Sequence, residues 1–315
     1  MTNPVLKTEK LTKRYGALTA VRDLTLEVYE GEVFGFLGPN GAGKTTSINM
    51  ICGLLKPDAG RVLVRGVPLA SGAAEVRTRV GMCPQNIVLW ERLTCLEQLQ
   101  FMGQMYGISG GEARRRGLKL LDDLDLAEKR DKLARTLSGG MQRRLNLGMA
   151  LVHDPEIVVL DEPEAGLDPQ SRIKVREYLQ SLARKKTVIL TTHNMDEADR
   201  VVDRVAIIDR GELLELDTPE NLKQRGGEGD VVEIHLNNGL HDEAQARAVL
   251  NGLVAEVTLE ASAHVLRVRA LNAVGQLSTI LETLAAAGAQ PGEVSIRTNT
   301  LEDVFIRLTG RRLRE

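Results

Sequence analysis

The sequence predicts an α/β fold followed by a second, smaller α+β domain. Two short apolar runs, "EIVVLDEP" at 156–163 and "KTVILTTH" at 186–193, are typical of strands that are buried on both faces of a parallel sheet. Segments with helical periodicity alternate with such strands, which is the pattern of an α/β sheet. Near residue 225 the glycine-rich, charged stretch "KQRGGEGD" interrupts this pattern. We therefore expect one domain over 1–224 and another over 225–315.

Length and composition agree with two globular domains. The chain has 315 residues, more than a single hydrophobic core usually holds. Hydrophobic residues make up 43% and charged residues 27%, which argues against a mainly disordered chain. Lys and Arg number 41 against 43 Asp and Glu, so the net charge of -2 gives no overall attraction to nucleic acid. We expect no nucleic-acid partner.

The cysteines and the apolar runs bear on where the protein works. Cys52, Cys83 and Cys95 show neither pairing nor metal-site spacing, which favours reduced thiols in a cytoplasmic protein. The opening "MTNPVLKTEK" lacks the apolar core of a secretion signal. No run approaches the roughly 18 apolar residues of a membrane-spanning helix. We therefore expect any work at a membrane to be done through a partner.

The expected elements of the first domain follow in order. Short strands occupy 5–34, and a helix over 44–55 opens directly after a glycine-rich loop and ends at the turn "KPDAG". "GRVLVRGVPL" then predicts a pair of strands. From about 94 to 137 the periodicity becomes helical, which predicts a helical subdomain over about 86–137, inserted between strand-rich parts. After the two buried strands, "RVAIIDRGELLEL" predicts a closing hairpin.

The second domain has a regular order of short elements. Strand, helix, strand, strand, helix, strand is the β-α-β-β-α-β order of a ferredoxin-like domain. An extra helix follows, in which Leu301, Val304, Phe305 and Leu308 share one face. The expected bounds are 231–237, 241–252, 253–260, 264–270, 272–287, 293–298 and 300–309.

The glycine-rich loop predicts a phosphate site. "GPNGAGKT" matches G-x-x-x-x-G-K-[ST], follows an apolar strand and precedes a helix, as phosphate binding by backbone N–H groups requires. Lys44 is then expected to reach the β- and γ-phosphates, and Thr45 to offer its hydroxyl to Mg²⁺. A plain strand-to-helix turn is the alternative, and the context disfavours it. The expected contacts are Gly38, Pro39, Asn40, Gly41, Ala42, Gly43, Lys44, Thr45 and Thr46.

Two adjacent carboxylates complete this prediction. Asp161 ends a buried strand, where it can hold Mg²⁺ directly or through a water. Glu162 follows at once, points to the other side and can orient or polarise the attacking water. Alone, the pair would read equally well as ordinary acidic surface residues. Beside a phosphate loop, it predicts the hydrolytic half of an ATP site.

A third motif narrows the prediction to one family. "LSGGMQRR" at 137–144 resembles the signature of the ATP-binding cassette (ABC) family. The family's other motifs occur in the expected order over roughly 5–220. They are Tyr15 in "KRYG", Gln85 in "CPQN", "GLDP" at 166–169 and His193 at the end of "VILTTH". Taken singly, Tyr15, Gln85 and His193 would be a packing, a turn and a strand-end residue.

The resemblance implies a site shared between two chains. In the family, the segment corresponding to Ser138, Gly139 and Gly140 faces the ATP of the other subunit, so two cassettes close head-to-tail around two nucleotides. A chain with one cassette would then form a dimer, here a homodimer, with ATP and Mg²⁺ as cofactors. The further implied roles are adenine stacking by Tyr15, sensing of Mg²⁺ or the lytic water by Gln85, contact of His193 with the γ-phosphate, and coupling of the two sites through Asp168.

Two features stand apart from these motifs. Many family members carry Thr and a small residue after the Glu-Pro pair, whereas this chain has Glu164 and Ala165, for which the sequence offers no account. The arginine clusters 114–116 and 143–144 are expected to lie on solvated helix faces.

The end of the chain suggests the use of the ATP. "NTLEDVFIRLTGRR" and "NLKQRGGEG" resemble the C-terminal segment of cassette ATPases of the daunorubicin-resistance and sodium-export type, which pair with a separate multi-helix permease. This implies the ATPase subunit of an exporter on the cytoplasmic face of the membrane, whose helical insertion moves the permease. An importer ATPase shares every cassette motif. A soluble ABC protein acting on nucleic acid or ribosomes is disfavoured by the single cassette and the lack of zinc-type cysteines.

Overall fold

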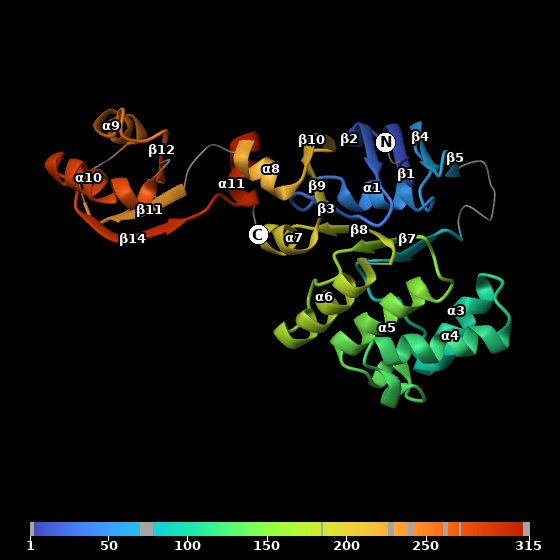
Figure 1. Ribbon diagram of the computed structural model, residues 1–315. Helices are drawn as coiled ribbons and strands as arrows, with labels where there is room; N and C mark the ends of the chain where they lie inside the picture. The colour runs from blue at the N-terminus through green and yellow to red at the C-terminus, as the bar shows by residue number, and fades with distance from the viewer. Residues whose placement is uncertain are drawn as a thin grey trace. The chain divides into compact units, whose positions relative to one another are not determined.

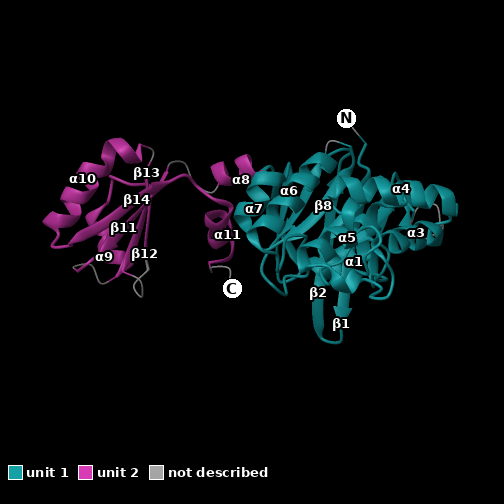
Figure 2. Ribbon diagram, turned by 90° about the horizontal axis from the view of Figure 1, so that it is seen from below, with its two compact units in different colours: residues 1–218, 313–315 teal, residues 219–312 magenta. Residues whose placement is uncertain are grey.

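The computed structural model describes residues 3–69, 78–183, 185–225, 230–238, 242–260, 264–270 and 272–310. The chain forms two compact units that divide between Thr218 and Pro219 (Figure 2). Helix α8 (Pro219–Arg225) groups with the second unit, where it packs against α11 (Leu301–Thr309). The division therefore falls slightly before the glycine-rich stretch in which we expected it.

A six-stranded sheet forms the centre of the first unit. Its strand order is β10-β9-β3-β8-β7-β6, and all neighbours are parallel except β10 and β9. Every residue of β3, β7 and β8 is buried, as expected for strands covered on both faces. The bounds are β3 Val33–Leu37, β6 Val80–Cys83, β7 Ile157–Asp161, β8 Thr187–Thr192, β9 Arg204–Asp209 and β10 Glu212–Asp217.

An antiparallel sheet and a short helix pack against this centre. The sheet has the order β2-β1-β4-β5, with β1 Leu6–Tyr15, β2 Leu18–Val28, β4 Ala59–Val64 and β5 Val67–Pro68. Helix α1 (Lys44–Ile51) shares one hydrophobic core with both sheets, through side chains such as Ile48, Phe36 and Leu26. The helix ends four residues before Leu55, because Gly53 adopts a left-handed φ of 70°.

A helical insertion lies between β6 and β7 and extends past the stretch 86–137 in which we expected it. It contains α3 (Cys95–Met105), α4 (Gly110–Asp123) and α5 (Gly139–Leu151), which lie side by side in Figure 1. Thr94 begins α3 with a capping box that it forms with Glu97. Two 3₁₀ turns, Ala127–Lys129 and Ala134–Thr136, connect α4 to α5. Helices α6 (Pro169–Ala183) and α7 (Met195–Val201) complete the unit.

The arginines of α5 contradict the sequence-based expectation. We expected Arg143 and Arg144 on a solvated helix face, but they are only 3% and 5% exposed. The prediction was wrong because α5 is enclosed along most of its length, so that even its charged side chains lie in the interior. Arg114 and Arg115 are exposed, as predicted.

The second unit contains its elements in the predicted order. They are β11 (Asp230–Leu236), α9 (Glu243–Val249), β12 (Glu256–Glu260), β13 (Val265–Ala270), α10 (Ala273–Ala286) and β14 (Pro291–Arg297), followed by α11. The sheet is antiparallel with the order β12-β13-β11-β14, and both inserted helices contribute to its core. In α11, Leu301, Val304 and Phe305 are buried, but Leu308 is 38% exposed.

Two further observations concern the cysteines and the helices. Cys52, Cys83 and Cys95 are free thiols, as predicted. Among the described residues, no helix combines the length and the apolar character that crossing a membrane requires.

Candidate functional site

The glycine-rich loop connects the end of β3 to the start of α1. Gly41 and Gly43 adopt left-handed φ angles of 81° and 102°, a region that favours glycine. A Cβ on Gly43 would lie 2.4 Å from the Ala20 carbonyl oxygen, so a larger residue does not fit there. A Cβ on Gly41 would point into open space. The loop therefore leaves room on its outer side at the N-terminus of a helix, where a phosphate group fits.

Lys44 lies at the base of this loop. Its Nζ donates to the carbonyl oxygens of Gly38 at 2.7 Å and Pro39 at 3.1 Å, and it lies 3.8 Å from Glu162 Oε1. Burial lowers the pKa of Lys44, and the charges of Glu162 and Asp161 oppose that effect. A buried cation beside an open loop suits an anionic ligand.

The two carboxylates after β7 occupy different environments. Asp161 is buried, and its Oδ1 accepts a hydrogen bond of 2.5 Å from Thr191 Oγ1 on the neighbouring strand β8. The backbone N–H of Glu162 donates to the same Thr191 hydroxyl oxygen at 2.9 Å. Thr191 thus fixes the junction between the two acids. Glu162 itself has a left-handed φ of 47°, which is costly for a residue with a side chain.

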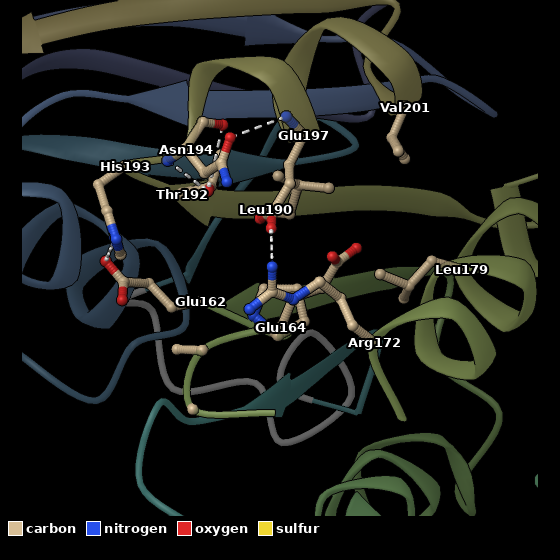
Figure 3. Close-up of a pocket in the computed structure, with 13 residues that line it drawn as sticks. Glu162, Glu164, Arg172, Leu179, Leu190, Thr192, His193, Asn194, Glu197 and Val201 are labelled. Atoms are coloured by element: carbon tan, nitrogen blue, oxygen red, sulfur yellow. Dashed lines mark hydrogen bonds and ion pairs between the residues drawn. The ribbon is translucent and has the colours of Figure 1, made fainter. Parts of the chain in front are cut away.

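Glu162 lies at the centre of the polar contacts. Gln85 Nε2 donates to its Oε2 at 3.0 Å. His193 Nδ1 lies 3.1 Å from its Oε1, a contact that Figure 3 shows. These partners come from separate segments, because Gln85 follows β6 and His193 follows β8. The carboxylate is thereby held in one orientation next to Lys44.

These residues line a groove with a volume of about 940 Å³. Tyr15 stands on its wall and is half exposed, with Lys13 Nζ 5.8 Å from its ring centroid. Sequence reasoning missed Arg210, which also lines the groove from the β9–β10 turn, because "DRG" there belongs to no motif. The predicted residues on the wall are Tyr15, Asn40, Gly41, Gly43, Lys44, Thr45, Thr46, Gln85, Glu162 and His193.

The signature segment is placed differently. Ser138 is the N-cap of α5, where its hydroxyl accepts from the Met141 N–H at 3.3 Å. A Cβ on Gly140 would lie 2.0 Å from Ser171 Oγ and 3.7 Å from Asp168 Oδ2, so these residues are close neighbours. Hydrogen bonds from Ser171 hold the pKa of Asp168 below its usual range. None of Ser138, Gly139, Gly140 and Asp168 lines the groove. The family resemblance implies for them a part in a site shared with a second chain.

Glu164 has a structural partner that the sequence did not reveal. It is buried, and its carboxylate accepts from Arg176 of α6 at 2.8 and 3.3 Å. Burial raises the pKa of the nearby Glu197, and the charge of Glu164 adds to this rise. Arg172, which lies 3.6 Å from Glu197, and Glu164 line a small cavity of about 170 Å³ (Figure 3). Glu162 and His193 line both this cavity and the groove.

Comparison with known proteins identifies the family. A family model described as "ABC transporter" matches residues 21–165. The chain is 37% identical to a daunorubicin resistance ATP-binding protein of Streptomyces coeruleorubidus, over 100% of this chain and 99% of that protein. It belongs to the ATP-binding subunits of ABC transporters. It is also 40% identical to a Nod factor export ATP-binding protein of Ralstonia nicotianae, over 99% and 96% of the two chains.

A solved structure adds the chemical state of a relative. An ATP-binding cassette described as a dimer in a post-hydrolysis state, bound to ADP and phosphate, has a TM-score of 0.62 and 28% identity over 68% of this chain and 98% of its own. The ABC subunit described here is accordingly an ATPase that binds ATP. Among the described residues no cluster of three or more His, Cys, Asp or Glu could hold a metal by itself.

Proposed function

We propose that this ABC ATPase drives export through a separate membrane permease from the cytoplasmic face of the membrane. The observation that supports ATP hydrolysis is the groove in which Gln85 and His193 hold Glu162 beside the phosphate loop. The names of the relatives, which refer to drug resistance and to export, support this direction of transport. An importer would need the same groove, and the C-terminal segment together with the names of the relatives favours export.

Side chains in the groove, together with the buried Asp161 beside it, divide the work of hydrolysis. We assign the phosphates to the N–H groups of the loop and to Lys44, and the adenine ring to Tyr15. Thr45, Asp161 and Gln85 offer oxygen atoms, the ligand type that Mg²⁺ prefers, and the ion would neutralise charge on the phosphates. Glu162 accepts a proton from, or orients, the attacking water. His193 steadies this carboxylate and reaches toward the γ-phosphate.

The site needs a second copy of the chain. Ser138, Gly139 and Gly140 begin α5 with N–H groups that suit a γ-phosphate, but they do not line the groove of their own chain. In the proposed homodimer they cover the groove of the partner, and Asp168, next to Ser171 and Gly140, connects the two sites. The relative solved as a dimer supports this arrangement.

An exposed apolar cluster on the helical insertion suits the permease. The cluster begins two residues after Gln85 and continues onto α3, and Trp90 and Phe101 are in edge-to-face contact with 4.9 Å between their ring centroids. Exposed apolar clusters of this kind mark protein interfaces. Its position next to Gln85 would transmit closure of the ATP site to the permease. The cluster consists of Ile87, Val88, Trp90, Phe101 and Met105.

The two units take different parts in this proposal. We assign nucleotide binding to the first unit and infer a ferredoxin-like domain for the second, which the antiparallel order β12-β13-β11-β14 supports. The domain boundary then lies near Thr218, and the segment from 219 onward belongs to the C-terminal domain.

The test is recovery of the permease from the native host. We expect the tagged chain to co-purify with a multi-helix membrane protein, and Val88→Asp to lose it because a charge enters the apolar cluster. The matched control is Ile173→Asp on α6, since Ile173 is 53% exposed and Val88 57%. Equal recovery with both variants would exclude the cluster as the docking surface. Recovery of ribosomes or DNA in place of a membrane protein would refute the transporter function.

A further inference from the structure

Arg143 makes an unusual set of contacts for a buried cation. Its guanidinium group has five N–H donors, and all five point to backbone carbonyl oxygens. Nε donates to one oxygen at 3.0 Å, Nη1 to two at 2.6 and 2.8 Å, and Nη2 to two at 2.9 and 2.6 Å. The acceptor of Nε is the Pro163 oxygen. The acceptors of Nη1 are the oxygens of Pro84 and Gln85, and those of Nη2 are the oxygens of Asp161 and Glu162.

These carbonyls belong to the two segments that carry the proposed hydrolytic groups. One segment is 84–85, from which the Gln85 side chain reaches the Glu162 carboxylate at 3.0 Å. The other is 161–163, in which Glu162 adopts its left-handed φ of 47°. Such a conformation is costly for a residue with a side chain and persists only where neighbours enforce it. Arg143 donates to the carbonyl oxygen of Glu162 and to those of its two neighbours, Asp161 and Pro163.

The same side chain belongs to the signature helix. Arg143 lies on α5, which begins at the Ser138 N-cap that we assign to the ATP of the partner chain. The guanidinium thus connects the segment that faces the partner with the carboxylate and amide that act on the chain's own ATP. Lysine could not replace it, because an ammonium group has three donors and no planar fork.

We propose that Arg143 is a positioning residue for hydrolysis: it holds Gln85 and Glu162 in their working geometry and joins them rigidly to the signature segment. This inference rests on the proposed roles of those residues. Arg143 does not line the groove, so it acts through the backbone and touches no part of the nucleotide.

The neighbouring arginine provides a matched control. Arg144 is on the same helix and is equally buried. It donates to the carbonyl oxygens of Leu124 at 2.6 Å and Asp125 at 3.1 Å, and to the Asp125 carboxylate at 3.2 Å. Those acceptors lie at the end of α4, and none of them belongs to the site. A loss that comes from disturbing α5 or from burying a poorly bonded lysine would therefore occur in both variants.

The experiment compares Arg143→Lys with Arg144→Lys in ATP hydrolysis and in ATP binding. We expect Arg143→Lys to lower kcat by roughly 10- to 100-fold, since displacement of a reacting group by about 1 Å costs up to that much. ATP affinity, measured by equilibrium binding, should change little, and kcat of Arg144→Lys should stay near the wild-type value. The thermal midpoint of each variant reports how far the fold is disturbed.

A second variant at the same position keeps the inference testable if Arg143→Lys does not fold. Arg143→Gln removes the charge but keeps two N–H donors, and it too should lose hydrolysis while retaining ATP. Wild-type kcat in a folded Arg143 variant would overturn the inference. So would equal losses in the Arg143 and Arg144 variants, or a loss of ATP binding that matches the loss of kcat.

The Glu162→Gln variant distinguishes a failure of this inference from a failure of the proposed role of Glu162 in hydrolysis. If that variant hydrolyses ATP at the wild-type rate, the role of Glu162 is refuted and Arg143 has no hydrolytic group to position. If Glu162→Gln is inactive while Arg143→Lys turns over normally, only the role of Arg143 is refuted. If both are impaired, adding Arg143→Lys to Gln85→Ala should cost less than the product of the single effects, because both act on one carboxylate.

Discussion

At the residue scale, the candidate site depends on side chains whose role can be predicted only from the motifs around them. Gln85 and His193 are unremarkable in the sequence, and only the order of the motifs predicted a role for them. In the structure both lie within hydrogen-bonding distance of one Glu162 carboxylate. The bonds of Arg143 could not have been predicted, because its acceptors are carbonyl oxygens up to 59 residues away, which every residue type presents.

Glu164 leads to a stability prediction at this scale. Glu164→Gln should lower the free energy of unfolding of the first unit by about 2 to 3 kcal/mol, because it leaves Arg176 without its charged partner in a mostly buried position. We expect less than the full cost of breaking a buried pair, since the Arg176 side chain is 21% exposed. Chemical denaturation measures the change.

The double variant provides the control. Glu164→Gln combined with Arg176→Gln should be less damaging than the sum of the two single changes, because it leaves no uncompensated charge. A Glu164→Gln protein as stable as the wild type would show that the pair contributes nothing and that Glu164 has another reason to be there.

At the element scale, continuous apolar runs were the most informative feature of the sequence. They predicted β7 and β8, whose residues are all buried. Amphipathic periodicity predicted α11, although Leu308 is exposed where the pattern placed it with the buried face. The burial of α5 on nearly all sides could not be predicted, because its polar residues follow the pattern of an exposed helix.

Helix α11 carries a prediction about pH. Burial acts to raise the pKa of Asp303, but hydrogen bonds from Arg297 and from Thr300, its capping-box partner, outweigh it and hold the pKa at about 2. A carboxyl group whose pKa is lower in the folded state stabilises the fold above its unfolded pKa of about 3.9, and this contribution is lost as pH falls toward 2. The shift corresponds to roughly 2.6 kcal/mol, which solvent screening of a partly exposed pair reduces to roughly 2 kcal/mol.

The measurement compares wild type and Asp303→Asn in chemical denaturation between pH 6 and pH 3. The stability difference for the second unit should be roughly 2 kcal/mol at pH 6 and should shrink below about pH 4. Glu302→Gln is the control, because Glu302 is its exposed neighbour on the same helix. A difference that stays constant over this range would contradict the assignment.

At the scale of the whole molecule, the groove of one chain holds only part of the residues that are expected to contact each ATP. The phosphate loop and the Glu162 carboxylate line the groove, whereas Ser138, Gly139 and Gly140 do not. The order of motifs in the sequence predicted both halves. The fold separates the phosphate loop from the signature segment within one chain. The loop lies at the end of β3, whereas the signature lies at the start of α5, beside α6.

The most direct test of this shared site is the mass of Glu162→Gln in solution, measured by light scattering with and without ATP and Mg²⁺. Glu162→Gln should retain ATP without hydrolysing it. We expect a mass near the 34.5 kDa of one chain without ATP and about twice that mass with it. Adding Ser138→Arg, which removes the signature contact, should keep the protein monomeric with ATP bound. A protein that binds ATP and still has the mass of one chain, or a dimer that forms regardless of Ser138, would contradict the account.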